Sequence, residues 1–131
     1  MKRKLGDVIV ILILSFFGRA YGSNLLTNPV VMVTPMVLDF GSVKAGTTVT
    51  NTLLLENAGG GKLVGKASVP APFKIISGGS YSLKENSAQV VTITYTPGRA
   101  PADTQTVTFT GGAGGKATVT GRNSGVASPS K

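Results

Sequence analysis

The run of residues 47–57 restricts the fold of this chain more than any other stretch. Val49, Leu53 and Leu55 share one parity of the run, and threonines at positions 48, 50 and 52 take the other. Since the side chains of a β-strand point alternately to its two faces, this alternation predicts a strand with one face on a core and one in solvent. Asn57-Ala58-Gly59 then supplies a sharp exit, because asparagine and glycine favour turns.

The rest of the chain repeats this alternation of short strands and turn signals. From Asn28 onward, threonine and valine dominate the runs, glycine and proline separate them, and no window of eleven or more residues repeats its apolar positions at the helical spacing. The predicted strands are residues 30–34, 37–43, 47–57, 63–69, 73–76, 81–83, 88–96, 104–110 and 116–120. Their spacing predicts an all-β fold, an immunoglobulin-like antiparallel β-sandwich of about seven to nine short strands.

The inward-facing positions of these strands predict the hydrophobic core. Its expected members are Leu38, Phe40, Val49, Leu53, Leu55, Phe73, Val91, Ile93, Tyr95, Val107, Phe109 and Val119. At the turns, we expect Gly46 and Gly59 to need a positive φ, which other residues adopt only with strain. Gly112 and Gly114 lie in a longer glycine-rich loop, where we expect substitutions to be absorbed.

The first 22 residues have the features of an export signal. Basic residues at positions 2–4 precede the uninterrupted apolar run Val8–Phe17, and Ala20 and Gly22 place small residues where a signal peptidase reads the chain. A membrane-spanning helix needs roughly 20 apolar residues, so this run is too short to span a bilayer comfortably. Export to the periplasm or the cell surface is the leading interpretation, and an uncleaved anchor is the alternative.

The 131 residues therefore divide into four segments. Residues 1–22 are the predicted signal peptide, and residues 23–34 form an N-terminal arm. Residues 35–122 form the sandwich, which is long enough to build a core without disulfides. Residues 123–131 are rich in serine, glycine and proline, and we expect a flexible tail.

The composition leaves few groups for catalysis or metal binding. The chain has no histidine and no cysteine, which excludes Ser-His-Asp and Cys-His nucleophiles and metal sites built on imidazole or thiolate. After residue 22 the remaining acids are Asp39, Glu56, Glu85 and Asp103, at outward or loop positions. We therefore predict no catalytic, cofactor-binding or metal-ligating residue, no cofactor and no enzymatic activity.

The net charge gives no indication of nucleic-acid binding. It falls from +8 to +5 when residues 1–22 are removed, because nine basic and four acidic residues remain. These basic residues are scattered singly along the chain, whereas a nucleic-acid site gathers them, so no nucleic-acid partner is expected.

Two local motifs have structural explanations. The Gly60–Lys66 run resembles a phosphate-binding loop, but Ala67 stands where serine or threonine is required, and the prolines that follow prevent the necessary helix. Asn57 could contact a ligand, but an asparagine just past a strand can bond its own backbone and close the turn, which is the role we assign.

These residues together resemble the ASH domain, the immunoglobulin-like module named for abnormal-spindle and Hydin proteins, and its bacterial relatives, the choice-of-anchor D domains. The matching signals are Leu38-Asp39-Phe40-Gly41 with Val43 and Gly46, Asn57-Ala58-Gly59, Pro72-Phe73, the Val91-Ile93-Tyr95-Pro97 strand end and Val119-Thr120-Gly121. The resemblance implies a non-enzymatic module that mediates protein contacts, and it supplies no catalytic residues. Eukaryotic relatives accompany cilia, centrosomes and membrane-trafficking machinery, but the predicted export signal argues against a microtubule partner.

We expect an exported module that mediates protein–protein contacts at a bacterial cell envelope or surface, through an exposed sheet edge or end loops. No membrane insertion is expected once the signal is removed. An alternative is a self-assembling surface or filament subunit, in which residues 24–34 pair with a neighbour's edge strand. An exported enzyme is a third alternative. A binding module predicts that the N-terminal arm packs on its own sheet, whereas a subunit predicts concentration-dependent polymers.

We predict that the signal is cleaved between Gly22 and Ser23, because that junction combines a preceding apolar core with small residues at both recognition positions. N-terminal sequencing of the exported protein checks this expectation. A mature product that retains Met1 would instead support the membrane anchor.

Overall fold

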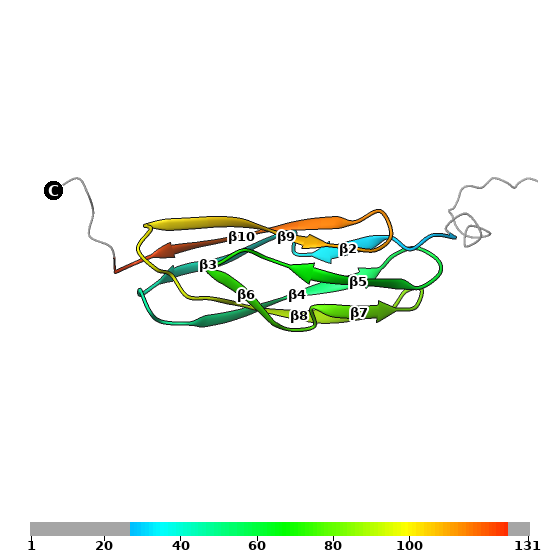
Figure 1. The fold of residues 1–131 in the computed structure, drawn as a ribbon, viewed down its shortest axis with the longest axis horizontal. Coiled ribbons are helices and arrows are strands. Elements are labelled where there is room, and N and C mark those ends of the chain that lie inside the picture. The colour runs from blue at the N-terminus through cyan, green and yellow to red at the C-terminus, as the bar shows by residue number, and fades with distance from the viewer. Residues whose placement is uncertain (1–26, 126–131) are drawn as a thin grey trace, which may run out of the picture.

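The computed structural model describes residues 27–125 and shows a β-sandwich (Figure 1). The predicted signal peptide and most of the predicted tail lie outside the described residues. All nine predicted strands are present, with ends shifted by a few residues. They are β2 (Val31–Thr34), β3 (Val37–Val43), β4 (Val49–Asn57), β5 (Leu63–Ser68), β6 (Phe73–Ser77), β7 (Ser80–Leu83), β8 (Ala88–Tyr95), β9 (Ala102–Phe109) and β10 (Gly115–Asn123).

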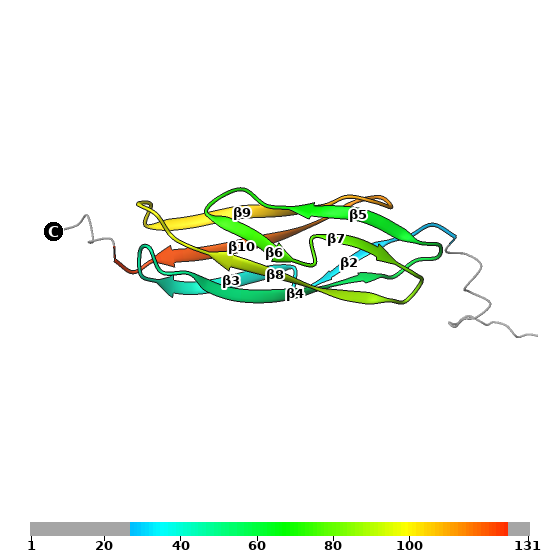
Figure 2. The ribbon, with the colours of Figure 1, turned by 60° about the horizontal axis from the view of Figure 1, so that its bottom comes forward.

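The strands form two sheets that face each other along the long axis of the molecule (Figures 1 and 2). One sheet has the order β3-β10-β9-β5-β7, and the other has the order β2-β4-β8-β6. The described part of the chain begins at one end of the long axis and finishes at the other (Figure 1). Within it, no helix is long and apolar enough to cross a membrane.

The sandwich is not purely antiparallel, which corrects the sequence prediction. β3 pairs in parallel with β10, from Val37 opposite Thr118 to Val43 opposite Asn123. This pairing arises because the chain changes sheets after β2, which is antiparallel to β4. Pro35 separates the two strands, since proline has no N–H for a ladder. On the other side of the sandwich, β6 and β7 change sheets in the same way across Gly78 and Gly79.

The predicted core is confirmed apart from Phe40 and Val49, which are only partly buried and pack against it. The strand parity that defined it was therefore correct. The structure adds residues from short strands and strand ends, where two or three alternations gave too little signal: Val33, Val43, Leu63, Tyr81, Leu83 and Ala117.

Three aromatic rings close one part of this core. Phe73 stacks on Tyr95 with ring centroids 4.7 Å apart, and Phe40 tilts against both at 5.6 and 5.8 Å. Gly121 of β10 lies against the Tyr95 ring, and a Cβ at this position would collide with it. The absence of a side chain at Gly121 therefore leaves the space that Tyr95 occupies.

Of the two glycines expected to need a positive φ, Gly46 and Gly59, the structure confirms one. Gly46 has the expected φ of +81°, but Gly59 does not need a positive φ. Its constraint is space, because a Cβ there would collide with the backbone of Asn28 and Val30. The expected tolerance of the 111–115 loop was wrong, since Gly112 and Gly114 have φ of +55° and +81°. A tight hairpin, closed by the Gly114 N–H bonding to the Gly111 carbonyl at 2.8 Å, removes the slack.

The Asn57 side chain closes its own turn, as predicted, and also binds two other segments. Its Oδ1 accepts from the N–H groups of Gly59 at 3.0 Å and Val30 at 3.1 Å. Its Nδ2 donates to the carbonyls of Gly61 at 3.0 Å and Leu83 at 3.1 Å. The side chain is fully buried. It therefore joins the N-terminal arm, the exit of β4 and the end of β7 at one point.

We predict that Ile93→Ala lowers the free energy of unfolding by roughly 2–5 kcal/mol, because it leaves a cavity at a position with no exposed surface. Within the aromatic cluster, Phe73→Ala should cost more than Phe40→Ala, since Phe73 is only 3% exposed and Phe40 is partly exposed. Denaturant unfolding of the three variants measures both effects. An unchanged midpoint for Ile93→Ala would contradict the assigned strand parity.

Candidate functional site

Strand β9 offers an open edge in the middle of the five-stranded sheet. Its threonines at 104, 106 and 108 lie on the exposed face, and Val107 and Phe109 enter the core. β10 pairs with it along its whole length, without a register shift. On the other side, β5 pairs with it only through Ala67 opposite Phe109 and Ser68 opposite Thr108. The edge from Ala102 to Val107 is therefore uncovered by β5.

β5 leaves β9 because of the residues that follow it. After Ser68 the chain continues as Val69-Pro70-Ala71-Pro72, in which neither proline can donate to a ladder. This segment turns toward the opposite sheet, where Phe73 begins β6 opposite Tyr95 of β8. The sequence predicted that this segment cannot sit in a sheet centre, and its departure is what leaves β9 uncovered.

The direction of the β9 backbone groups follows from the two-residue repeat. The Thr110 N–H donates to the Lys66 carbonyl at 3.0 Å, so even-numbered residues of β9 direct their backbone groups toward β5. On β10, Thr118 is the register partner of Thr106, and its N–H donates to the Met36 carbonyl at 2.8 Å, on the side away from β9. The backbone groups of Thr106 therefore also point away from β10. Thr104 and Thr106 consequently direct an N–H and a carbonyl each into the uncovered side.

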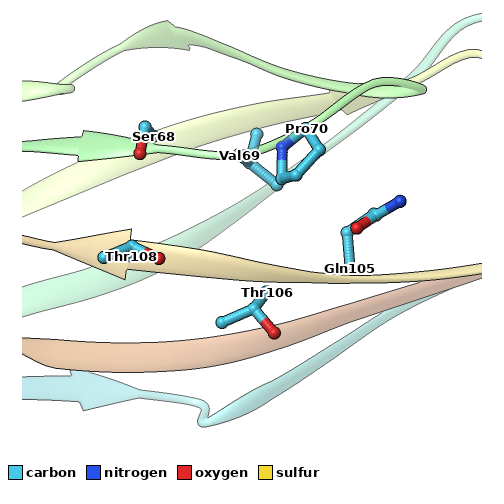
Figure 3. Close-up of a pocket in the computed structure, with 6 residues that line it drawn as sticks. All are labelled: Ser68, Val69, Pro70, Gln105, Thr106 and Thr108. Carbon is cyan, nitrogen blue, oxygen red and sulfur yellow. The ribbon is translucent and has the colours of Figure 1, made fainter.

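A hollow of about 460 Å³ lies along this edge. Figure 3 shows β5 and the Val69–Pro70 segment on one side and β9 on the other, with the Gln105 side chain reaching into the space between them. The lining residues are Ser68, Val69, Pro70, Gln105, Thr106 and Thr108, none of which carries a charge. The Gln105 Nε2 donates a long hydrogen bond of 3.4 Å to the Ala71 carbonyl. This contact is exposed, and an incoming backbone could replace it.

The terminal strands of the two sheets are poorer edges for strand addition. β2 and β7 have four residues each. The pairings of β3 and β6 are interrupted by register shifts, at Thr120/Arg122 and at Ile75/Ser77. Short and bulged edges are the features by which natural proteins discourage unwanted strand pairing. β9 lacks both features, which makes its uncovered side the candidate site.

The acids near the aromatic cluster have structural partners. The Tyr95 hydroxyl donates to Asp103 Oδ2 at 2.8 Å. Burial, together with the neighbouring Asp103 carboxylate, raises the pKa of Tyr95 to about 12. On the outer face, the Gly41 N–H and the Thr120 hydroxyl donate to Asp39 and lower the pKa of its carboxyl. Asp103 is thus not merely solvated surface, as its loop position had suggested.

The other candidates weighed from sequence do not come together. Glu56 lies on the outer face of the four-stranded sheet and Glu85 in the turn before β8, whereas Asp39 and Asp103 belong to β3 and β9 of the other sheet. Within residues 27–125, no three acidic side chains form a group that could hold a metal ion. Lys66, from the phosphate-loop resemblance, is an exposed residue of β5, and a strand rather than a helix follows the glycines.

The fold has relatives among solved structures, although no protein-family model and no curated protein sequence matches the chain. The ASH/PapD-like domain 7 of human CEP192 superposes with a TM-score of 0.60 and 20% identity, over 92% of this chain and 98% of that one. The chain has the immunoglobulin-like fold of ASH and PapD-like domains.

Two further structures with a similar fold come from bacterial chaperone systems. The E. coli chaperone DraB has a TM-score of 0.60 and 14% identity, over 76% of this chain and 58% of that one. The CsuC–CsuE chaperone–tip adhesion subunit pre-assembly complex, from the Csu pili of Acinetobacter baumannii, has a TM-score of 0.56 and 9% identity, over 76% of this chain and 60% of the matched one. The match to this chain thus spans about three fifths of each of those chains.

The raised pKa of Tyr95 predicts that the protein loses stability in alkali. The folded state favours the protonated phenol, so this contribution is complete below about pH 10 and is lost as the pH rises toward 12. Tyr95→Phe should be less stable than the wild type at pH 8, because the hydrogen bond to Asp103 is gone. The difference should shrink or reverse at pH 12. Denaturant unfolding at both pH values checks it, and a pH-independent difference would contradict it.

Proposed function

We propose that the protein is an exported, non-enzymatic ASH/PapD-like module that binds a protein partner at a bacterial cell envelope by accepting an extended segment on the open edge of β9. The observation that supports this is the regular, uncovered stretch Ala102–Val107, which lies in the middle of a sheet and is bordered by a hollow. An extended peptide adds to such an edge mainly through its backbone.

The backbone groups of Thr104 and Thr106 supply the affinity in this proposal. Each presents one donor and one acceptor to the uncovered side, so a partner strand forms about four main-chain hydrogen bonds there. Because neighbouring strands lie about 4.8 Å apart, the partner occupies the hollow between β9 and the Val69–Pro70 segment.

The side chains around the hollow supply the selectivity. Alternate partner residues point inward, where they meet Gln105, Val69 and Pro70, and outward, where they meet the threonines of β9. Nothing in this lining is charged, so uncharged partner segments with small or apolar inward residues are favoured. Binding should not depend on divalent metal or on pH between 6 and 8, since the lining residues do not titrate in that range.

Export rests on the N-terminal sequence and receives indirect support from the relatives. One of the similar structures is a chaperone–tip adhesion subunit pre-assembly complex from chaperone-usher pili. This likeness, the predicted export signal and the open edge of β9 all support a role in contacts between envelope proteins.

We predict that Thr106→Pro abolishes partner binding while the sandwich remains folded. Proline removes the N–H that faces the uncovered side and leaves the β9–β10 ladder intact, which is where proline is tolerated in sheets. A pull-down from envelope extract with the wild type and the variant, with and without chelator, measures the effect.

Two matched variants sharpen this experiment. Gln105→Lys keeps every backbone group but places a charge beside the hollow, and it should also weaken binding. Thr118→Ser on the adjacent β10 serves as the control, because β10 pairs on both sides and the change keeps every backbone group, and it should bind normally. Full binding by a folded Thr106→Pro protein would refute the proposed edge, and binding lost with chelator would refute the mode.

A further inference from the structure

The described part of the N-terminal arm, residues 27–34, takes its backbone hydrogen bonds from one strand, β4, and the turn that follows it. β2 pairs with β4 from Val31 opposite Asn57 to Thr34 opposite Leu54. Before it, the Val30 N–H donates to Asn57 Oδ1, and the Val30 carbonyl accepts from the Ala58 N–H at 2.9 Å. Together these contacts form an acceptor, residues 54–60, that recognises an extended strand through its backbone.

Two hollows border the opposite side of the arm, although Val31 lies directly against Gly115 of β10. A hollow of about 200 Å³ separates β2 from the start of β10, and it is lined mainly by Val31, Met32, Val33, Met36, Gly115 and Lys116. A second hollow, of about 530 Å³, lies between residues 28–30 and the loop at Gly112–Ala113. Of the two inward valines of β2, Val33 is the buried one, at 8% exposed. On leaving the sandwich, the arm would give up its hydrogen bonds to the acceptor and the packing of Val31 and Val33 on the core, and an identical site on another copy would restore both.

The hinge that follows the arm exposes apolar side chains. Pro35 and Met36 join β2 to β3, and both are exposed. Met36 is 68% exposed, the highest value among the large apolar residues that the structure describes. The adjacent Val37 is 60% exposed, as is Val64. Burying this exposed apolar surface would be favourable.

We propose that the N-terminal arm exchanges reciprocally between two copies of this chain, each arm pairing with the acceptor of the other. The exchanged dimer re-forms the β2–β4 ladder and the Val30–Asn57 bond with the same residues, so these contacts contribute equally to both states. The states differ at the hinges, which run side by side about a two-fold axis in the dimer and bury Met36 and Val37 against their counterparts. The loss of translational freedom on association opposes the free energy gained by burying these side chains. Because two chains must meet to form the dimer, its fraction rises with concentration.

This self-association is independent of the proposed partner site. It uses the edge of β4 in the four-stranded sheet, whereas the partner is proposed to bind β9 in the other sheet. Thr106→Pro should therefore leave exchange unaffected.

Disulfide trapping tests the exchange, because the chain has no cysteine of its own. Thr34 and Leu54 are exposed register partners on the outer face of the sheet. Two purified single variants, Thr34→Cys and Leu54→Cys, are mixed at high concentration, incubated under reducing conditions and then oxidised. The control mixture pairs Thr34→Cys with Thr50→Cys, which places an equally outward-facing thiol on β4 four residues from Leu54.

Exchange predicts a mixed disulfide between the Thr34→Cys and Leu54→Cys chains that exceeds the control by roughly tenfold or more, since paired strands hold the thiols at a high effective concentration. Mass spectrometry of the linked peptides identifies it. The double variant Thr34→Cys/Leu54→Cys verifies that the pair can bond. If the double variant closes within one chain while the mixture equals the control, the arm does not exchange. If it closes neither within nor between chains, the acceptor is absent in solution, and the proposal is equally refuted.

A hinge variant provides a second measurement. Met36→Ser combined with Val37→Ser leaves β2 and the acceptor unchanged but removes the apolar surface that the dimer buries. Light scattering over a concentration series should show a dimer for the wild type and a dimer fraction at least severalfold lower for this variant. A monomeric wild type at all concentrations would overturn the proposal.

Discussion

One buried amide holds the architecture at the point where three segments meet. Asn57 has no exposed surface, and its side chain makes four hydrogen bonds to main-chain groups of the arm, the β4 exit and the end of β7. An amide is suited to this position because it both donates and accepts, whereas aspartate would leave two carbonyls without donors. Asn123 has a similar role at the other end, where it accepts from Gly125 N–H and donates to the Gly98 carbonyl.

The strands and most of the core could be predicted because they depend on local alternation. The parity of Val49–Leu55 and of Val91–Tyr95 places the same side chains inward in the structure as in the sequence pattern. The parallel pairing of β3 with β10 could not be predicted in this way, since it joins residues about 80 positions apart and depends on where the chain changes sheets. Gly59 illustrates the same limit, because its constraint is the approach of Asn28 and not its own backbone angle.

The candidate site was predictable in kind but not in place. Sequence reasoning favoured a sheet edge and identified Pro70-Ala71-Pro72 as a segment that cannot lie within a sheet. It could not tell that β9 would lose its neighbour there, because this requires knowing that β5 pairs with β9 at Ala67 and Ser68. Gln105 was overlooked for a related reason: it occupies an inward position of a strand, and only the departure of β5 exposes it to the hollow (Figure 3).

The parallel contact between β3 and β10 has a mechanical consequence. The described chain begins at one end of the sandwich's long axis and finishes at the other (Figure 1). β3 belongs to the N-terminal part of this chain and β10 is its last strand, and the two run side by side in the same direction. A pulling force applied between the termini would load the ladder between them in shear, so that its hydrogen bonds resist together and do not open one after another. A domain tethered at both ends would therefore transmit tension along its length.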